Sequence, residues 1–119
     1  MDASVREILL EGGIRVDEML ERCMGSEALL SRLLKKFPAD ISFSKLQDAF
    51  QNSDEEAALE ASHTLKGVCG NLSVVDLFEL LDLQVHLLRD HDWEGAFSMM
   101  PKISQRYHAA LQAIEKAYH

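Results

Sequence analysis

The sequence predicts an all-α fold: an up-down four-helix bundle with additional short helices at its N-terminal end. Three observations support this prediction. Apolar residues recur at three- and four-residue spacings, and no stretch shows the two-residue period of a strand. Short polar turns separate these segments, which favours antiparallel neighbours. With 119 residues, 47% of them hydrophobic, the chain is expected to form a single domain, 1–119, with its own core.

Glycine, proline and capping residues set the expected helix ends in the first half of the chain. A Gly-Gly pair ends the first helix, Gly25 ends the second, and Ser26 can cap the third. Pro38 breaks or kinks that third helix because proline lacks the backbone N–H that a helix interior needs. A shorter helix then starts at Asp40 or Ser42.

The second half contains longer helices with equally short connections. Ser53 followed by Glu56 has the spacing of a capping box, and Ser73 with Asp76 resembles another cap. Pro101 is either a kink inside the final helix or the start of its main part. The predicted helices cover about 4–11, 16–24, 27–37, 42–50, 54–71, 74–89 and 93–118.

Composition excludes several functional classes. The chain has 12 basic and 20 acidic residues and a formal net charge of -8, so no nucleic-acid partner is expected. No segment approaches the ~18 consecutive apolar residues of a membrane span, and the N-terminus lacks signal-peptide features, so we expect a cytoplasmic protein without a membrane partner. Cys23 and Cys69 are predicted to be reduced, buried thiols.

His63 stands out on the predicted helix 54–71. At ~100° per residue, it lies ~200° from Ala61 and Leu65 and therefore points away from the core. The apolar stripe that faces the core consists of Ala58, Ala61, Leu65, Val68 and Leu72. The outward face around His63 consists of Leu59, Glu60, Lys66, Gly67 and Gly70.

The two glycines on this face need an explanation. Each costs roughly 1 kcal/mol relative to alanine inside a helix, and bare backbone lets another protein approach closely. Lys66 places a positive charge where an anion attached to His63 would lie. Periodicity alone leaves open whether this is a phosphoryl site or an ordinary surface histidine.

The stretch His63-Thr64-Leu65-Lys66-Gly67-Val68-Cys69-Gly70-Asn71-Leu72 resembles the signature of histidine-containing phosphotransfer (HPt) domains of bacterial phosphorelays. The resemblance implies a helical bundle that carries phosphoryl groups between aspartates of receiver domains. The receiver domains belong to response regulators or hybrid histidine kinases. The resemblance also implies that the chain has no kinase activity of its own. It implies no cofactor, because the Mg²⁺ ion is bound by the receiver domain. His63 would be the phosphoacceptor through Nε2 and Lys66 its charge partner. Gly67 and Gly70 would give the receiver access. Leu59, from its place on the face around His63, is also expected to contact the partner.

Two positions depart from the family pattern. Ser73 stands where many members have glycine, at the turn between the two central helices, and a serine cap can do similar work there. The other position is on the facing helix. Many members place a Gln or Glu on the facing helix, where it hydrogen-bonds the imidazole. Counting without gaps, this position falls on Val85, with Gln84 beside it. Gln84 is therefore a possible imidazole orienter, and the alternative is that the ring is oriented without it.

Other functions are also considered. The chain could be a helical adaptor that binds a receiver domain or kinase without carrying phosphate. A histidine kinase is disfavoured because no nucleotide-binding glycine loop is present. No metal site is expected, since His86 and His91 are five residues apart, a poor spacing on one helix face. His108 and His119 are expected to be surface residues, and the chain is expected to be a monomer.

Overall fold

The computed structural model describes residues 1–118, and its elements are helical throughout. The helices are α1 (Ala3–Glu11), α2 (Val16–Arg22), α3 (Glu27–Lys36), the 3₁₀ turn η1 (Phe37–Ala39), α4 (Ser42–Gln51), α5 (Glu55–Asn71), α6 (Val75–Arg89), α7 (Trp93–Ser98) and α8 (Met100–Tyr118). Over these residues the all-α prediction is confirmed, and an isolated bridge between Ile14 and Val74 is the one β-type pairing. The predicted surface residue His119 lies outside the described residues.

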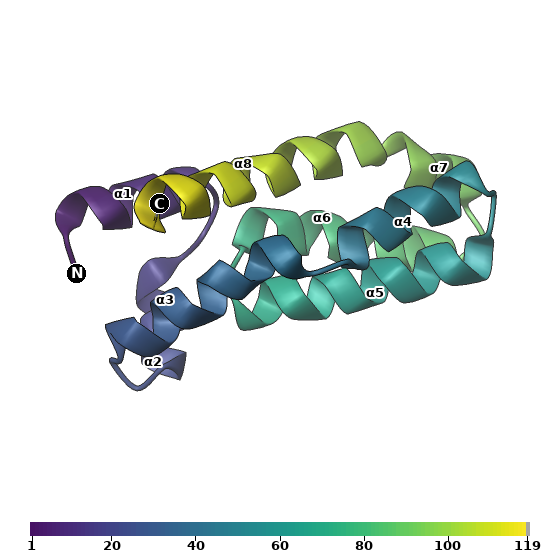
Figure 1. Ribbon diagram of the computed structural model, residues 1–119. Coiled ribbons are helices and arrows are strands. Elements are labelled where there is room, and N and C mark those ends of the chain that lie inside the picture. The colour runs from purple at the N-terminus through teal and green to yellow at the C-terminus, as the bar shows by residue number, and fades with distance from the viewer. Residues whose placement is uncertain (119) are drawn as a thin grey trace.

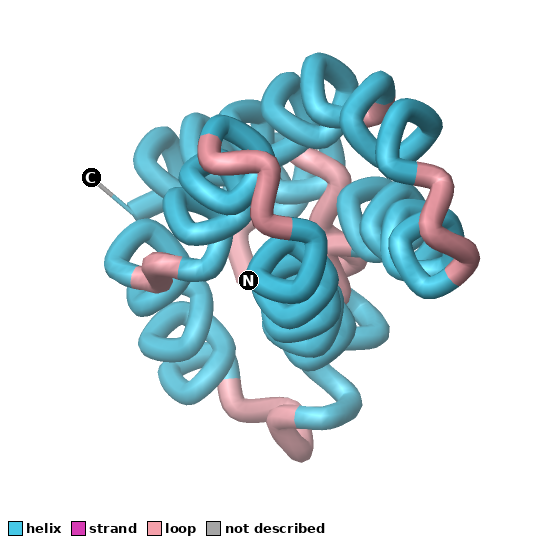
Figure 2. Tube along the Cα trace, turned by 90° about the vertical axis from the view of Figure 1, so that its right-hand side faces the viewer, coloured by secondary structure: helices cyan, strands magenta, loops and turns pink. Residues whose placement is uncertain are grey.

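The long helices lie side by side along an elongated body of 44 × 24 × 19 Å (Figure 1). α5 packs between α4 and α6, while α8 packs along α1, α3 and α6. In a view turned by 90°, the helices surround a common interior and are joined by short loops (Figure 2). Within 1–118, no helix combines the length and apolar character that crossing a bilayer requires.

One continuous apolar cluster holds these helices together. Burial of each large apolar side chain contributes about 1.5–3 kcal/mol, so this cluster dominates the stability of the fold. The largest fully buried side chains include Leu9, Met19, Leu34, Phe37, Leu46, Leu65, Leu77, Leu81, Leu88 and Ile103.

Several predicted helix ends are confirmed. The hydroxyl of Ser26 accepts a hydrogen bond from the N–H of Leu29 at 3.1 Å, as expected of an N-cap. Pro38 ends the regular helix and lies in η1. Pro101 is the second residue of α8, so it marks the start of the main part of the final helical region.

Two predicted caps are wrong. Ser53 and Ser73 have φ angles of 52° and 55°, in the left-handed region, where each closes the helix that precedes it. The carboxylate of Asp54 caps α5 instead, accepting from the N–H of Ala57 at 3.0 Å. Val74 occupies the N-cap position of α6 without a side-chain hydrogen bond.

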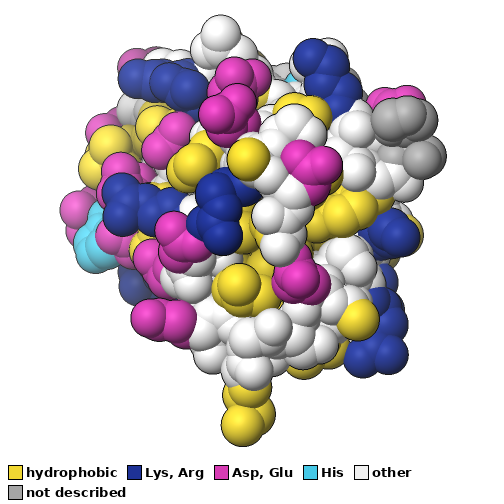
Figure 3. All heavy atoms as spheres, turned by 90° about the vertical axis from the view of Figure 1, so that its left-hand side faces the viewer, with side chains coloured by type: hydrophobic (Ala, Val, Ile, Leu, Met, Phe, Trp, Pro, Cys, Tyr) yellow, Lys and Arg dark blue, Asp and Glu magenta, His cyan; other side chains and the backbone are white. Residues whose placement is uncertain are grey.

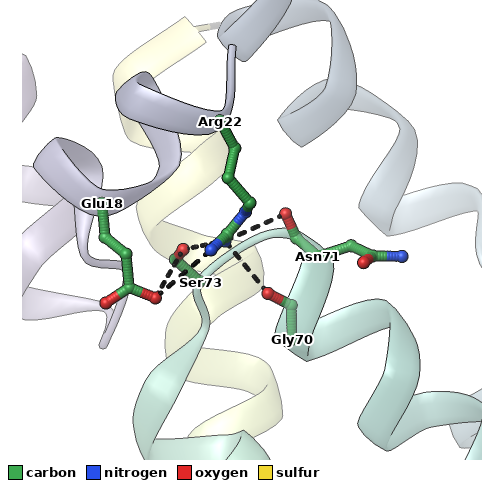
Figure 4. A network of polar contacts seen from close by, with 5 residues as sticks. All are labelled: Glu18, Arg22, Gly70, Asn71 and Ser73. Carbon is green, nitrogen blue, oxygen red and sulfur yellow. Dashed lines mark hydrogen bonds and ion pairs between the residues drawn. The ribbon is translucent and has the colours of Figure 1, made fainter. Parts of the chain in front are cut away.

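Arg22 of α2 ties the N-terminal helices to the end of α5 (Figure 4). Its guanidinium donates to the carbonyl oxygens of Gly70 at 3.0 Å and Asn71 at 3.2 Å, and to the hydroxyl of Ser73. That hydroxyl donates to Glu18 at 3.2 Å. A cation at a helix C-terminus satisfies unpaired carbonyl groups and complements the helix dipole, so this network fixes the turn between α5 and α6.

Candidate functional site

His63 lies in the middle of α5 and is exposed, as its predicted outward position requires. No residue of 1–118 hydrogen-bonds to either nitrogen of its imidazole. The imidazole is therefore exposed and without a hydrogen-bond partner from 1–118 at the centre of a regular helix. A neutral imidazole in this setting presents a lone pair to an approaching molecule.

The other histidines in the described part of the chain differ from His63. The Nδ1 atoms of His86 and His108 lie 2.7 and 2.8 Å from the carbonyl oxygens four residues earlier on their helices. His91 pairs through Nδ1 with the carboxylate of Glu55. Each of these rings already has a partner for one nitrogen, so His63 is the described histidine with its hydrogen-bonding capacity unused.

Lys66 lies one turn after His63 on α5, and it already has a partner. Its Nζ lies 3.4 Å from Oδ1 of Asp82 on α6. The Lys66 side chain is only 19% exposed and that of Asp82 is 46% exposed. The predicted positive charge is thus on the helix turn that follows His63, and it belongs to an ion pair between α5 and α6.

The two glycines of the outward face have different surroundings. A Cβ atom added to Gly67 would meet nothing within 4 Å, so its backbone is open, as the prediction of partner access requires. A Cβ atom added to Gly70 would lie 3.3 Å from the Phe78 ring of α6. Gly70 thus lets α6 pack closely, a structural role in addition to the predicted contact with a partner. Leu59 is partly buried and packs against the core cluster.

The hypothesis that Gln84 orients the imidazole is wrong. Gln84 is fully buried, and its Oε1 accepts from the hydroxyl of Ser62 at 2.8 Å. Its Nε2 donates to the carbonyl oxygen of Ala96 at 3.0 Å and to the sulfur of Met100 at 3.3 Å. Val85 is also fully buried. Both residues point into the core because α7 and α8 cover this side of α6.

The packing of α5 on α6 explains this error and shows how Asp82 could have been found. Gly70 faces Phe78 and Lys66 faces Asp82. A step of four residues back along α5 therefore corresponds to a step of four residues forward along α6, as expected for antiparallel helices. Folding the sequence about the turn near Ser73 would have brought Lys66 and Asp82 together. The same register brings His86, one turn beyond Asp82, to about the level of His63.

The buried thiols offer no competing nucleophile. Burial, together with the nearby negative charge of Asp40, raises the pKa of the Cys69 thiol to about 12. The thiolate is the reactive form of cysteine, so Cys69 is inert at neutral pH. Cys23 is buried as well, and both cysteines are free. Within 1–118, no three His, Cys, Asp or Glu side chains are grouped to hold a metal ion.

A groove of about 480 Å³ runs between α4 and α5 on the side of α5 next to His63. Glu60 and Thr64 of α5 line it, with Lys45 and Asp48 of α4 opposite. At the end of the molecule that carries α1 to α3, acidic and basic side chains are interspersed, so the net negative charge forms no single patch there (Figure 3). Near His63, the exposed Glu60 and the Lys66–Asp82 ion pair contribute charges of both signs.

Comparisons of the chain with protein-family models, with curated proteins and with solved structures found no significant match. The geometry must therefore carry any functional conclusion. It combines an exposed imidazole with both nitrogens unbonded, a lysine ammonium one turn away, and open backbone at Gly67. This combination suits a nucleophile that is used by an approaching macromolecule.

Proposed function

We propose that this chain is a histidine phosphotransfer protein. His63 accepts a phosphoryl group from an aspartyl-phosphate receiver domain and passes it to another receiver domain. The observation that carries the proposal is the imidazole itself: exposed at mid-helix, and with neither nitrogen hydrogen-bonded within residues 1–118. Lys66 and the open backbone at Gly67 lie on the same face and support it.

The chemistry needs little from this chain beyond position. Nε2 of neutral His63 attacks the phosphorus atom, an N–P bond forms, and the P–O bond to the partner's aspartate breaks, releasing its carboxylate. The proton on Nδ1 stays on the ring or passes to water. In the next transfer, a carboxylate of the second receiver attacks and the imidazole leaves. Such reactions depend on alignment and charge stabilisation, and Lys66 supplies charge close to the transferred group.

The partner supplies the remaining machinery. In this proposal a receiver domain brings the aspartate and the Mg²⁺, so the chain is a carrier without enzymatic activity or a cofactor of its own. We include in the proposal an HPt-type architecture, in which α4, α5, α6 and α8 form an up-down four-helix bundle and α1 to α3 are additions. We also propose that the chain is a monomer in the cytoplasm. Its partners are receiver domains of response regulators or hybrid histidine kinases.

Incubation with a phosphorylated receiver domain and Mg²⁺ tests the proposal. We expect acid-labile, alkali-stable label on the wild-type chain, complete loss of label in His63→Gln, and full labelling of the matched variant His86→Gln. Label that survives His63→Gln would refute the assignment. Incubation with ATP alone should give no label, and appreciable autophosphorylation would contradict a carrier role.

The alternative is a helical adaptor that binds a receiver domain or kinase without carrying phosphate. A buried or firmly hydrogen-bonded His63 would favour it, and His63 is neither. Receiver binding that is unchanged by His63→Ala, together with no detectable transfer, would select the adaptor.

A further inference from the structure

The ion pair between Lys66 and Asp82 links α5 to α6 beside His63. Lys66 Nζ and Asp82 Oδ1 are 3.4 Å apart, and the lysine side chain is mostly buried at 19% exposure. The ammonium therefore joins the two helices from a largely covered position. The cation closest in sequence to His63 is thus already neutralised while the imidazole carries no phosphate.

A phosphoryl group on His63 would compete with Asp82 for this ammonium. Such a group carries between about one and two negative charges at neutral pH and has three acceptor oxygens, whereas a carboxylate carries one charge. Asp82 is 46% exposed, so water can solvate its carboxylate when the lysine leaves. His86 adds little, since its Nδ1 donates to the Asp82 carbonyl at 2.7 Å and lies 3.9 Å from the carboxylate.

We propose that Asp82 is a positioning residue that holds Lys66 in the unphosphorylated chain and yields it to the phosphoryl group on His63. This inference rests on the proposed function. Asp82 weakens retention of phosphate in two ways, by competing for the ammonium and by repelling the phosphoryl oxygens. The carboxylate thereby limits the stability of the phosphorylated chain and favours transfer of the phosphoryl group to the next receiver domain.

The position of the transfer equilibrium tests this role. With a phosphorylated receiver domain and Mg²⁺, Asp82→Asn should raise the equilibrium ratio of phosphorylated to unphosphorylated chain about two- to five-fold, the range expected for one partly exposed ion pair. Asp82→Glu keeps the charge and should restore the wild-type ratio. Glu79→Gln, which removes the same charge from an exposed position one turn away on α6, is the matched control. An unchanged ratio in Asp82→Asn, or an equal change in Glu79→Gln, would overturn the proposal.

A second measurement does not need a receiver domain. Phosphoramidate phosphorylates histidine directly, and the carboxyl carbon of Asp82 can be followed by NMR in the treated chain. Phosphoramidate can also modify His86, whose Nδ1 lies 3.9 Å from this carboxylate, so the measurement is made in a His86→Gln background. We expect the resonance to shift when His63 is present and to stay fixed when His63→Gln is added. A fixed resonance in the chain that is phosphorylated on His63 would refute the exchange. A shift in a chain that accepts nothing from receiver domains would uphold the exchange while refuting the proposed function.

Discussion

Ser62 and His63 are neighbours on α5, about 100° apart around the helix, and this rotation is enough to bury one side chain and expose the other. The Ser62 hydroxyl is buried and donates to Gln84, which in turn donates to the Ala96 carbonyl at 3.0 Å. The His63 imidazole is exposed and is hydrogen-bonded by no residue of 1–118. Ser62 on the inner face thus uses its polar group internally, while His63 on the outer face leaves its ring nitrogens available to a partner.

The hydrogen bonds of the inner face explain how His63 on the outer face can be held in a defined position. The Ser62–Gln84 hydrogen bond fixes the rotation of α5 against α6, because a buried pair of polar groups is satisfied in one arrangement only. Arg22 fixes the end of the same helix through its contacts with Gly70 and Asn71. A reactive side chain on a helix held in this way is well positioned without contacts of its own.

The largest effect on stability is expected from breaking the inner pair. Gln84→Leu leaves the buried Ser62 hydroxyl without its acceptor and should lower the free energy of unfolding by about 1–3 kcal/mol. The Ala96 carbonyl stays bonded to the N–H of Met99. Adding Ser62→Ala should recover most of the loss, because both partners are then apolar. Urea unfolding of the four chains of this cycle measures the coupling, and additive losses would show that the pair does not act as a unit.

Removal of the Arg22 guanidinium should have a smaller effect. Arg22→Ala leaves carbonyl groups at the end of α5 to solvent, and we expect a loss of about 1 kcal/mol in unfolding free energy, since the side chain is 44% exposed. Arg32→Ala removes the same charge from an exposed position on α3 and should change stability by less than about 0.5 kcal/mol. Equal losses in the two variants would mean that net charge, and not the network of Figure 4, stabilises this end.

The smallest effect distinguishes the two outer-face glycines. Gly67→Ala should raise the unfolding free energy by about 0.5–1 kcal/mol, because alanine is the better helix former and the added methyl group meets open space. Gly70→Ala should gain less or lose stability, since Phe78 must move. Thermal unfolding measures both. Under the proposed function, Gly67→Ala should also slow phosphoryl transfer despite its greater stability, and unchanged transfer would show that open backbone at Gly67 is not used.

Much of the fold follows from local sequence signals. The helices end within a few residues of their predicted bounds, because glycine, proline and cap residues act on the turn in which they occur. The failures at Ser53 and Ser73 are local as well: both residues adopt left-handed backbone, and neighbouring positions become the N-caps. A serine three residues before an acidic residue predicts a nearby helix start, but it does not specify which residue is the cap.

The sequence by itself determined that His63 points outward with Gly67 and Lys66 nearby, because the rotation of a helix per residue is a local property. Only the tertiary structure decided what each neighbour does. Lys66 pairs with Asp82, Gly70 accommodates Phe78, and Gln84 serves the core, because these contacts depend on which helix packs on which side of α5 and α6. That choice is made by burial of the whole apolar cluster and is not encoded at any one position.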